Sequence, residues 1–461
     1  MGAPLPRISP EEAGVRAQWV QDMVGAYARR GLRIHSFLLV RGGRVYAEGY
    51  YSPYHPAQYQ TVYSLSKSFT SVAMGLAEEE GILSLDERVL DLFAQEAQGI
   101  QAGPELQSLT LRHLLRMSTG QPEERWEGDF VRTFLGVPFV DMPGKTFRYN
   151  TMATYMCAAA LHRRGVDLET YLQEKLFTPM GISGMHWMRT EAGICAGGFG
   201  LSILPEVIAK FGVLILQDGV WEGRQLLPRA YLRAATSKQI DNDGGSPDWR
   251  SGYGYQFWMC QNGSFRGDGM YGQLCVMNRE KDAVLAMTAF VDDIQAELDV
   301  YFDEVLGRMQ DAPLPPDPAA EERLRAALSG LVCPLEPVRD GGGEITAQLL
   351  NRPVSVLDGM LTLTPAPDGM LNVTSSYGHC VAARGELYGQ RTLCRARGSA
   401  RLDVVTEAYA GYGVAEGALV LRLLIPELMM DARLELRPDG NAVQAHVLDV
   451  HNPASPQPAR E

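Results

Sequence analysis

The chain has 461 residues, of which 46% are hydrophobic and 21% are charged, as in globular proteins of two or three domains. Its net charge of −13 argues against nucleic acid and anionic membranes as partners. No run of about 18 apolar residues predicts a membrane span, and the start of the chain lacks the pattern of a signal peptide. Seven scattered cysteines favour reduced thiols over disulfides or a metal site. We therefore expect a cytoplasmic protein without a metal or cofactor.

The first half of the chain predicts helices around a strand hairpin. Residues 9–12 (Ser-Pro-Glu-Glu) have the pattern of a capping box, so a helix is expected from there to Arg30. Residues 34–40 and 44–49 are two predicted strands around the turn signal Gly42-Gly43. Four further helices are expected at residues 64–81, 109–116, 154–164 and 204–217.

Strands dominate from Gly252 onward. They are predicted at residues 253–260, 273–278 and 283–290, and a helix is predicted at 292–309. A hairpin at the start and antiparallel strands at the end favour an α+β layered domain over residues 1–310. In it an antiparallel sheet, shared by early and late strands, has helices on both faces.

A proline-rich linker at residues 311–318 is the predicted domain boundary. Beyond it, a short helix precedes alternating strands with Pro-Asp-Gly turns at 367–369 and 438–440. Residues 319–451 are therefore expected to form a small antiparallel β-barrel or sandwich. The last ten residues, 452–461, are expected to be disordered.

The most informative motif is Ser64-Leu65-Ser66-Lys67, at the head of a predicted helix. Residues i and i+3 share a helix face, so Ser64 and Lys67 can meet above the first turn. A serine hydroxyl becomes a good nucleophile when a neighbour takes its proton, and a desolvated lysine amine can do so. This spacing alone is weak evidence, since it also arises by chance.

Two further motifs follow in order: residues 143–151 (PGKTFRYNT), before a helix, and residues 267–273 (GDGMYGQ), opening a strand. Together with residues 110–120 (TLRHLLRMSTG), they make the chain resemble the serine β-lactamase and penicillin-binding-protein superfamily. The resemblance is greatest to its class C, esterase and D-aminopeptidase-like branch. It covers roughly residues 10–308 and implies a β-lactamase/transpeptidase-like fold.

The resemblance implies roles for several residues. Ser64 would attack an acyl carbonyl and form an acyl-enzyme, Lys67 would accept or share its proton, and Tyr149 would act as general acid and base. The backbone N–H groups of Ser64 and Met270 would form the oxyanion hole, with Gly269 beside it. Thr151 stands where the family often has Asn in the tyrosine motif.

The third motif departs from the family, because Gly267 and Asp268 occupy the first two positions of the usual Lys-Thr-Gly or His-x-Gly. A cation that would bind a substrate carboxylate is absent from its slot, and Arg266 would point to the other face of a strand. This favours an esterase or amidase for uncharged or amine-bearing substrates over a β-lactamase or carboxypeptidase.

Other residues have a structural interpretation beside a functional one. Asp268 could form a turn or bind substrate, Trp126 could line a pocket or simply pack, and His113 is expected in the core rather than as a base. A serine hydrolase acting on a small molecule or short peptide is favoured. An acyl transferase of the same fold and a non-catalytic sensor remain open, as does the oligomeric state.

Overall fold

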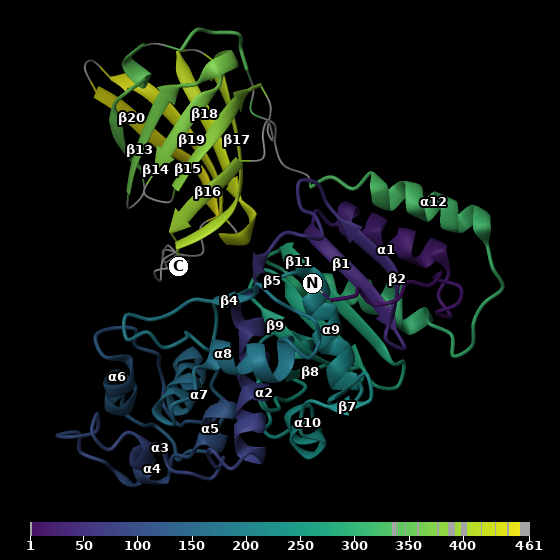
Figure 1. Cartoon of the computed structure of the whole chain (residues 1–461), viewed down its shortest axis with the longest axis vertical. Helices are drawn as coiled ribbons and strands as arrows, with labels where there is room; N and C mark the ends of the chain where they lie inside the picture. Colours follow the sequence, from purple (N-terminus) through teal and green to yellow (C-terminus); the bar gives the residue numbers. More distant parts are fainter. Residues whose placement is uncertain are drawn as a thin grey trace. The chain divides into compact units, whose positions relative to one another are not determined.

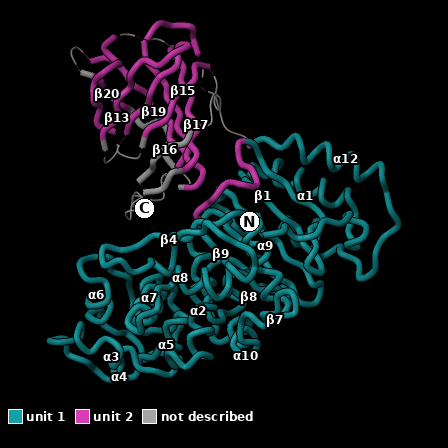
Figure 2. Tube along the Cα trace, in the orientation of Figure 1, with its two compact units in different colours: residues 1–52, 62–332 teal, residues 53–61, 333–461 magenta. Residues whose placement is uncertain are grey.

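The computed structural model (Figure 1) describes residues 2–333, 338, 340–345, 347–356, 359–375, 378–385, 392–397, 403–415, 417–428, 430–439 and 442–451. The chain forms two compact units (Figure 2). Unit 1 comprises Met1–Ser52 and Val62–Val332, and unit 2 comprises Pro53–Thr61 and Cys333–Glu461. The predicted tail at 452–461 lies outside the described residues.

The division between the units falls after the proline-rich segment 311–318, not within it. This segment leads into α12 (Pro318–Ser329), which begins at the cap of Asp317 and buries Ala320 and Leu324. Helix α12 packs against α1 (Ala17–Arg29). Because this apolar face is buried within unit 1, residues up to 332 belong to the first unit.

Unit 1 is built on one six-stranded antiparallel sheet with the order β2-β1-β11-β10-β9-β8. Its strands are β1 (Arg33–Arg41), β2 (Arg44–Tyr50), β8 (Trp258–Met259), β9 (Phe265–Gly269), β10 (Gln273–Asn278) and β11 (Ala283–Phe290). β1 pairs with β11, which confirms the prediction that early and late strands share a sheet. All residues of β11 are buried, so both faces of the sheet are covered, as the predicted layers require.

Helices cover this sheet and form a second layer beside it (Figure 1). The remaining α-helices of unit 1 are α2 (Ser66–Glu79), α3 (Val89–Leu92), α4 (Pro104–Ser108), α5 (Leu111–Leu115), α6 (Phe130–Gly136), α7 (Thr151–Arg163), α8 (Leu168–Leu172), α9 (Pro205–Leu216), α10 (Arg229–Ala235) and α11 (Ile294–Glu304). The short strands are β4 (His186–Trp187), β5 (Leu201–Ile203), β6 (Val220–Trp221) and β7 (Arg224–Gln225). α9 packs against β1, β10 and β11, and α2 packs against α7.

Two predicted elements were wrong in extent. The capping box of Ser9 and Glu12 exists, but it frames a turn, and helix α1 begins only at Ala17. Gly14 at φ +72° turns the chain out of a helical path between them. The predicted strand at 253–260 is reduced to Trp258–Met259, and Gln256 at φ +65° breaks the extended chain before it.

Unit 2 contains one large, strongly curved sheet with the order β12-β13-β14-β15-β17-β18-β19-β20, and β16 pairs with β17. Its strands are β12 (Pro353–Val356), β13 (Gly359–Pro365), β14 (Leu371–Ser375), β15 (Gly378–Arg384), β16 (Thr392–Arg397), β17 (Asp403–Ala415), β18 (Ala418–Ile425), β19 (Met430–Asp439) and β20 (Ala442–His451). β12 lies against β20, so the sheet nearly closes into a barrel. All pairings are antiparallel except that of β15 with β17. The predicted turn at 367–369 joins β13 to β14.

Unit 2 also takes in the short segment 53–61, which ends in β3 (Gln60–Thr61). Glu407 Oε2 lies 2.7 Å from His55 Nε2 and accepts a hydrogen bond from Gln58 at 3.2 Å. These contacts explain why a segment so early in the chain groups with the C-terminal strands. Among the described residues, no helix combines the length and hydropathy that crossing a bilayer requires.

Candidate active site

Ser64 and Lys67 meet at the start of the central helix of unit 1. Ser64 lies in a 3-10 turn (Tyr63–Leu65) that runs directly into α2. Lys67 Nζ lies 3.0 Å from Ser64 Oγ and donates a hydrogen bond of 2.8 Å to the carbonyl of Gly198. Tyr63, just before Ser64, has φ +44°, a conformation that costs energy in a non-glycine residue and is frequent at functional sites.

The environment of Lys67 favours the neutral amine. Its side chain is 1% exposed, and this desolvation lowers its pKa from 10.5 to about 7, although the negative charges of Glu124 and Asp268 oppose the shift. A large fraction of Lys67 is therefore unprotonated near neutral pH. Such an amine can accept a proton from a hydroxyl 3.0 Å away.

Tyr149 completes a group of three. Its ring lies 4.8 Å from Lys67 Nζ and stacks on Trp258 at 5.5 Å, and its hydroxyl hydrogen-bonds to Ser64. Burial of the hydroxyl raises the pKa of Tyr149 above 10, so it is a phenol at neutral pH. The residue is held in place because Asn150 caps α7 through a 3.0 Å hydrogen bond from the Ala153 N–H.

The third motif lies beside these residues on β9. Gly269 packs so closely that a Cβ atom there would come within 2.3 Å of the Val62 carbonyl oxygen. A Cβ at Gly267 would come within 2.3 Å of the Leu65 side chain. A lysine or histidine at 267 would therefore require the Leu65 side chain to shift. Met270 follows in the turn to β10 and is 55% exposed.

Arg266 and Asp268 form a buried ion pair on the opposite face of β9. Arg266 Nε donates to Asp268 Oδ2 at 2.9 Å, and their side chains are 0% and 8% exposed. Trp249 and Trp258 flank the guanidinium at 4.2 and 5.8 Å. Burial raises the pKa of Asp268, while Arg266 opposes the shift. Asp268 is thus a paired strand residue, and Arg266 is sealed from substrate.

The family model for beta-lactamase matches residues 16–293, more than half of the chain. The chain belongs to the beta-lactamase family. This confirms the family resemblance of the three motifs.

Individual relatives of this beta-lactamase-family protein differ in their activities. A 6-aminohexanoate-dimer hydrolase of Paenarthrobacter ureafaciens is 26% identical over 280 residues, which are 54% of this chain and 71% of the relative. A penicillin-binding protein homologue from Caulobacter crescentus superposes with a TM-score of 0.53 at 14% identity, covering 66% of this chain and all of its own. EstCE1, a hydrolase with promiscuous acyltransferase activity, gives a TM-score of 0.51 at 15% identity, covering 62% of this chain and 99% of its own. The two structures establish the likeness of fold.

Sequence reasoning missed Glu124 in this beta-lactamase-family protein. Its carboxylate accepts hydrogen bonds from the Thr151 backbone N–H and from Trp126 Nε1, the latter at 3.0 Å. Its charge acts on both Lys67 and Tyr149. Glu124 is 25 residues from Tyr149 in a loop without a motif, so only its position beside Trp126, already a candidate, could have drawn attention to it.

The other candidates have structural contacts as well. Trp126 is 39% exposed and meets the rings of Phe130 and Phe199 edge-on, so it both packs and presents surface. The Thr151 methyl group packs on Gly198, where a Cβ atom would be 2.6 Å away. His113 closes the capping box of α5 with Thr110, and burial lowers its pKa to about 4.

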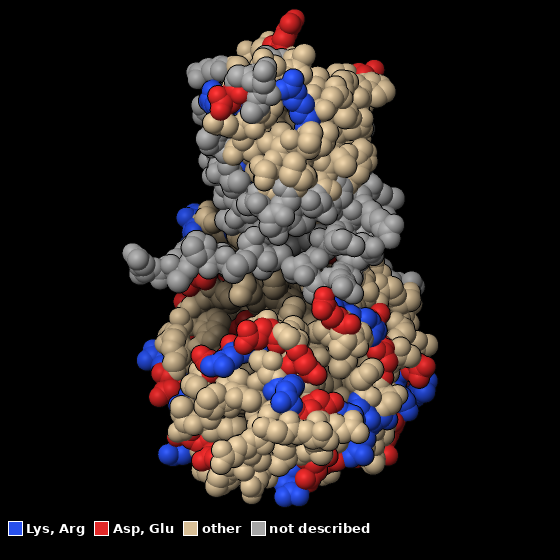
Figure 3. All heavy atoms as spheres, turned by 90° about the vertical axis from the view of Figure 1, so that its left-hand side faces the viewer, with Lys and Arg blue, Asp and Glu red and all other residues tan. Residues whose placement is uncertain are grey.

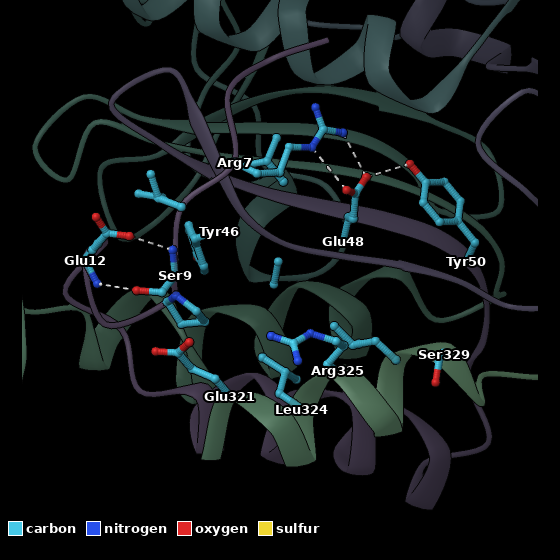
Figure 4. Close-up of a pocket in the computed structure, with 15 residues that line it drawn as sticks. Arg7, Ser9, Glu12, Tyr46, Glu48, Tyr50, Glu321, Leu324, Arg325 and Ser329 are labelled. Atoms are coloured by element: carbon cyan, nitrogen blue, oxygen red, sulfur yellow. Dashed lines mark hydrogen bonds and ion pairs between the residues drawn. The ribbon is translucent and has the colours of Figure 1, made fainter. Parts of the chain in front are cut away.

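A groove of about 810 Å³ lies elsewhere in unit 1, between β2 and α12 (Figure 4). Within it Arg7 forms an ion pair with Glu48, and Tyr50 donates a hydrogen bond to the same carboxylate. On the face shown in Figure 3, acidic and basic side chains of unit 1 are interspersed. Among the described residues, no three His, Cys, Asp or Glu side chains gather as metal ligands would.

Proposed function

We propose that this protein is a serine hydrolase that cleaves ester or amide substrates through an acyl-enzyme on Ser64. The observation that carries the proposal is the 3.0 Å approach of Lys67 Nζ to Ser64 Oγ, together with a Lys67 pKa of about 7. Membership of a family of hydrolases supports it.

The chemistry follows from the three side chains. Neutral Lys67 takes the Ser64 proton as Oγ attacks the acyl carbonyl, and the N–H groups of Ser64 and Met270 stabilise the oxyanion. Tyr149, a phenol at neutral pH, gives its proton to the leaving group and is reprotonated by Lys67. In the second half a water molecule attacks the acyl-enzyme carbonyl and its proton passes to neutral Lys67. The bond from the acyl group to Ser64 Oγ then breaks, and Lys67 returns the proton to Oγ.

Covalent labelling tests this proposal directly. Incubation with a fluorophosphonate, followed by peptide mass spectrometry, is expected to place one adduct on Ser64. A panel of p-nitrophenyl esters is expected to be hydrolysed by the same preparation. Labelling at another residue would contradict the proposal. Hydrolysis of any of the esters without labelling of the protein would also contradict it.

The pH dependence of kcat/KM is expected to follow Lys67. Below its pKa the ammonium form cannot accept the Ser64 proton, so activity is expected to rise as the pH increases through about 7. A lysine with its ordinary pKa of 10.5 would shift this rise to strongly alkaline pH. The measurement is kcat/KM for a neutral p-nitrophenyl ester between about pH 5 and 9.

The charges around the site favour neutral or amine-bearing substrates. Gly267 supplies no cation, and Arg266 is buried and already paired with Asp268. Arg266 offsets the charge of Asp268, and Glu124 is the other acidic group whose charge acts on Lys67 and Tyr149. The relative from Paenarthrobacter ureafaciens is, by name, a hydrolase of a substrate with both an amino group and a carboxylate, so it supports the amine-bearing part of this class alone.

Replacement of Glu124 is expected to change selectivity. Glu124→Gln is expected to lower kcat/KM for amine-bearing amides by about 10-fold relative to matched neutral esters. The reason is that the hydrogen bond between the substrate's ammonium group and the Glu124 carboxylate loses its negative charge. The control is Glu123→Gln, which removes an exposed carboxylate paired with Arg125 and is expected to leave the ratio unchanged. Carboxylate-bearing β-lactams are expected to be the poorest substrates of wild type. A β-lactam that came out best, or equal ratios in both variants, would contradict the charge argument.

Substitution of Asp268, which the sequence offered as a possible substrate ligand, is a poor test of substrate binding. Asp268→Asn removes the carboxylate partner of Arg266, whose side chain is fully buried. An unpaired buried charge destabilises a protein by several kcal/mol. We therefore expect this variant to unfold at lower temperature, so that its activity would reflect stability as well as substrate binding.

A further inference from the structure

The turn that carries Met270 is held from inside by Gln273. The buried Gln273 amide donates to the carbonyls of Met270 and Tyr271, both at 3.4 Å, and to that of Ala289 at 2.7 Å. It thus ties the turn to β11. The Met270 N–H belongs to the preceding peptide group, whose Gly269 carbonyl accepts a 3.2 Å hydrogen bond from the Gly272 N–H. Gln273 orients the two peptide groups that follow, and so acts on the Met270 N–H by holding the rest of the turn.

The aromatic neighbours of this turn also constrain it. Tyr271 has φ +63°, and its ring stacks on Phe290 at 4.5 Å and meets Tyr63 edge-on at 5.8 Å. Tyr63 directly precedes Ser64. Non-glycine residues with positive φ persist where surrounding contacts over-determine the backbone, so the nucleophile turn and the Met270 turn are held against each other.

Behind the turn lies Glu297, which the catalytic proposal does not use. It projects from α11, is 0% exposed, and lies so close to Gly272 that a Cβ atom there would be 2.2 Å from Oε2. Among the described residues, neither carboxyl oxygen of Glu297 has a hydrogen-bond partner, and neither does Gln273 Oε1. An acceptor on Gln273 and a carboxyl group that approaches the neighbouring Gly272 from α11 are therefore both unsatisfied.

The charge state of Glu297 makes these two groups complementary. Desolvation raises its pKa well above 4.5, and the neighbouring charge of Asp268 on β9 adds to the shift. Arg266 pairs with Asp268, and Tyr27 of α1 donates to the Glu297 backbone carbonyl at 3.4 Å. A buried carboxyl group that keeps its proton is a hydrogen-bond donor.

We propose that Glu297 is a positioning residue of the oxyanion turn, which donates a hydrogen bond to Gln273 Oε1 through one buried water. Gln273 in turn holds the Met270 and Tyr271 carbonyls. The pair acts on catalysis only through the Met270 N–H, and the inference therefore rests on the proposed function. Small displacements of an oxyanion donor cost one to two orders of magnitude in rate.

The test compares an isostere with an apolar replacement, measured with a p-nitrophenyl ester. Glu297→Gln keeps a donor and is expected to keep kcat within about twofold at neutral pH. Glu297→Leu removes the donor and is expected to lower kcat about 10- to 100-fold with little change in KM. Gln273→Leu is expected to lower kcat by a similar factor. The double variant is expected to lose no more kcat than the less active single variant, because both substitutions remove the same connection between Glu297 and Gln273.

Several results would overturn the inference. One is a kcat of Glu297→Leu equal to that of wild type. Another is a loss of kcat in the double variant equal to the product of the two single losses. If the leucine variants do not fold, the pH profile decides. Wild-type kcat is expected to fall at alkaline pH, where Glu297 ionises beside Asp268, and Glu297→Gln is expected to lack this fall; identical alkaline limbs overturn the inference. Loss of fluorophosphonate labelling in Ser64→Ala tests the proposed function separately, so the two failures are distinguishable.

Discussion

Ser64→Ala is expected to abolish ester hydrolysis and fluorophosphonate labelling. The variant removes the oxygen that would form the acyl-enzyme, and loss of a nucleophile of this kind costs about 10⁴-fold or more in kcat. Ser64 is only half-buried, within the 3-10 turn, so the change in Tm is expected to stay within about 2 °C. Labelling is measured by intact-protein mass spectrometry, and Tm by circular dichroism.

Ser66→Ala is the matched control for this experiment. Its hydroxyl accepts a 3.1 Å hydrogen bond from the Leu201 N–H and points away from Lys67. Removing it leaves a buried N–H unsatisfied, which costs about 1–3 kcal/mol. The control is therefore expected to be less stable but still labelled, the opposite pattern to Ser64→Ala. Full activity in Ser64→Ala would reject the nucleophile assignment.

The second large effect concerns Lys67 and Tyr149 acting as one proton-handling unit. Lys67 Nζ lies 4.8 Å from the Tyr149 ring, and both groups contact Ser64. Residues that act as a unit show strongly non-additive losses. Lys67→Ala, Tyr149→Phe and the double variant are therefore expected to be inactive to a similar degree, each by about 10³-fold or more in kcat.

The double-mutant cycle is evaluated from kcat with one p-nitrophenyl ester, after each variant is shown to be folded. A double loss equal to the product of the single losses would mean that Lys67 and Tyr149 work independently. The proposed proton path from Ser64 to the leaving group would then be wrong, although Ser64 could remain the nucleophile.

Features of the fold that depend on local sequence were predicted well. The strands at 273–278 and 283–290 have the predicted bounds, and the turn at 367–369 joins two strands as expected. The first helix and the strand at 253–260 were wrong in extent because of the positive φ of Gly14 and Gln256, whereas the end of unit 1 depends on a distant contact. Residues 319–332 belong to unit 1 because α12 finds α1 to pack against, and a proline-rich segment carries no information about that partner.

For the candidate site, the sequence by itself determined which residues to consider. The spacing of Ser64 and Lys67, with Tyr149 and Met270 in later motifs, identified the family, because three short motifs in a fixed order rarely coincide by chance. An i, i+3 pair at a helix start is a local feature, so its geometry follows from the helix itself.

Only the tertiary structure decided the surroundings of these residues. It paired Arg266 with Asp268, set Glu124 against Thr151 and placed Glu297 behind Gly272. Glu124 and Glu297 come from a loop and a helix far from the motifs they approach. The burial of Glu297 and the position of Glu124 beside Thr151 arise from packing between separate segments, which has no counterpart in sequence spacing.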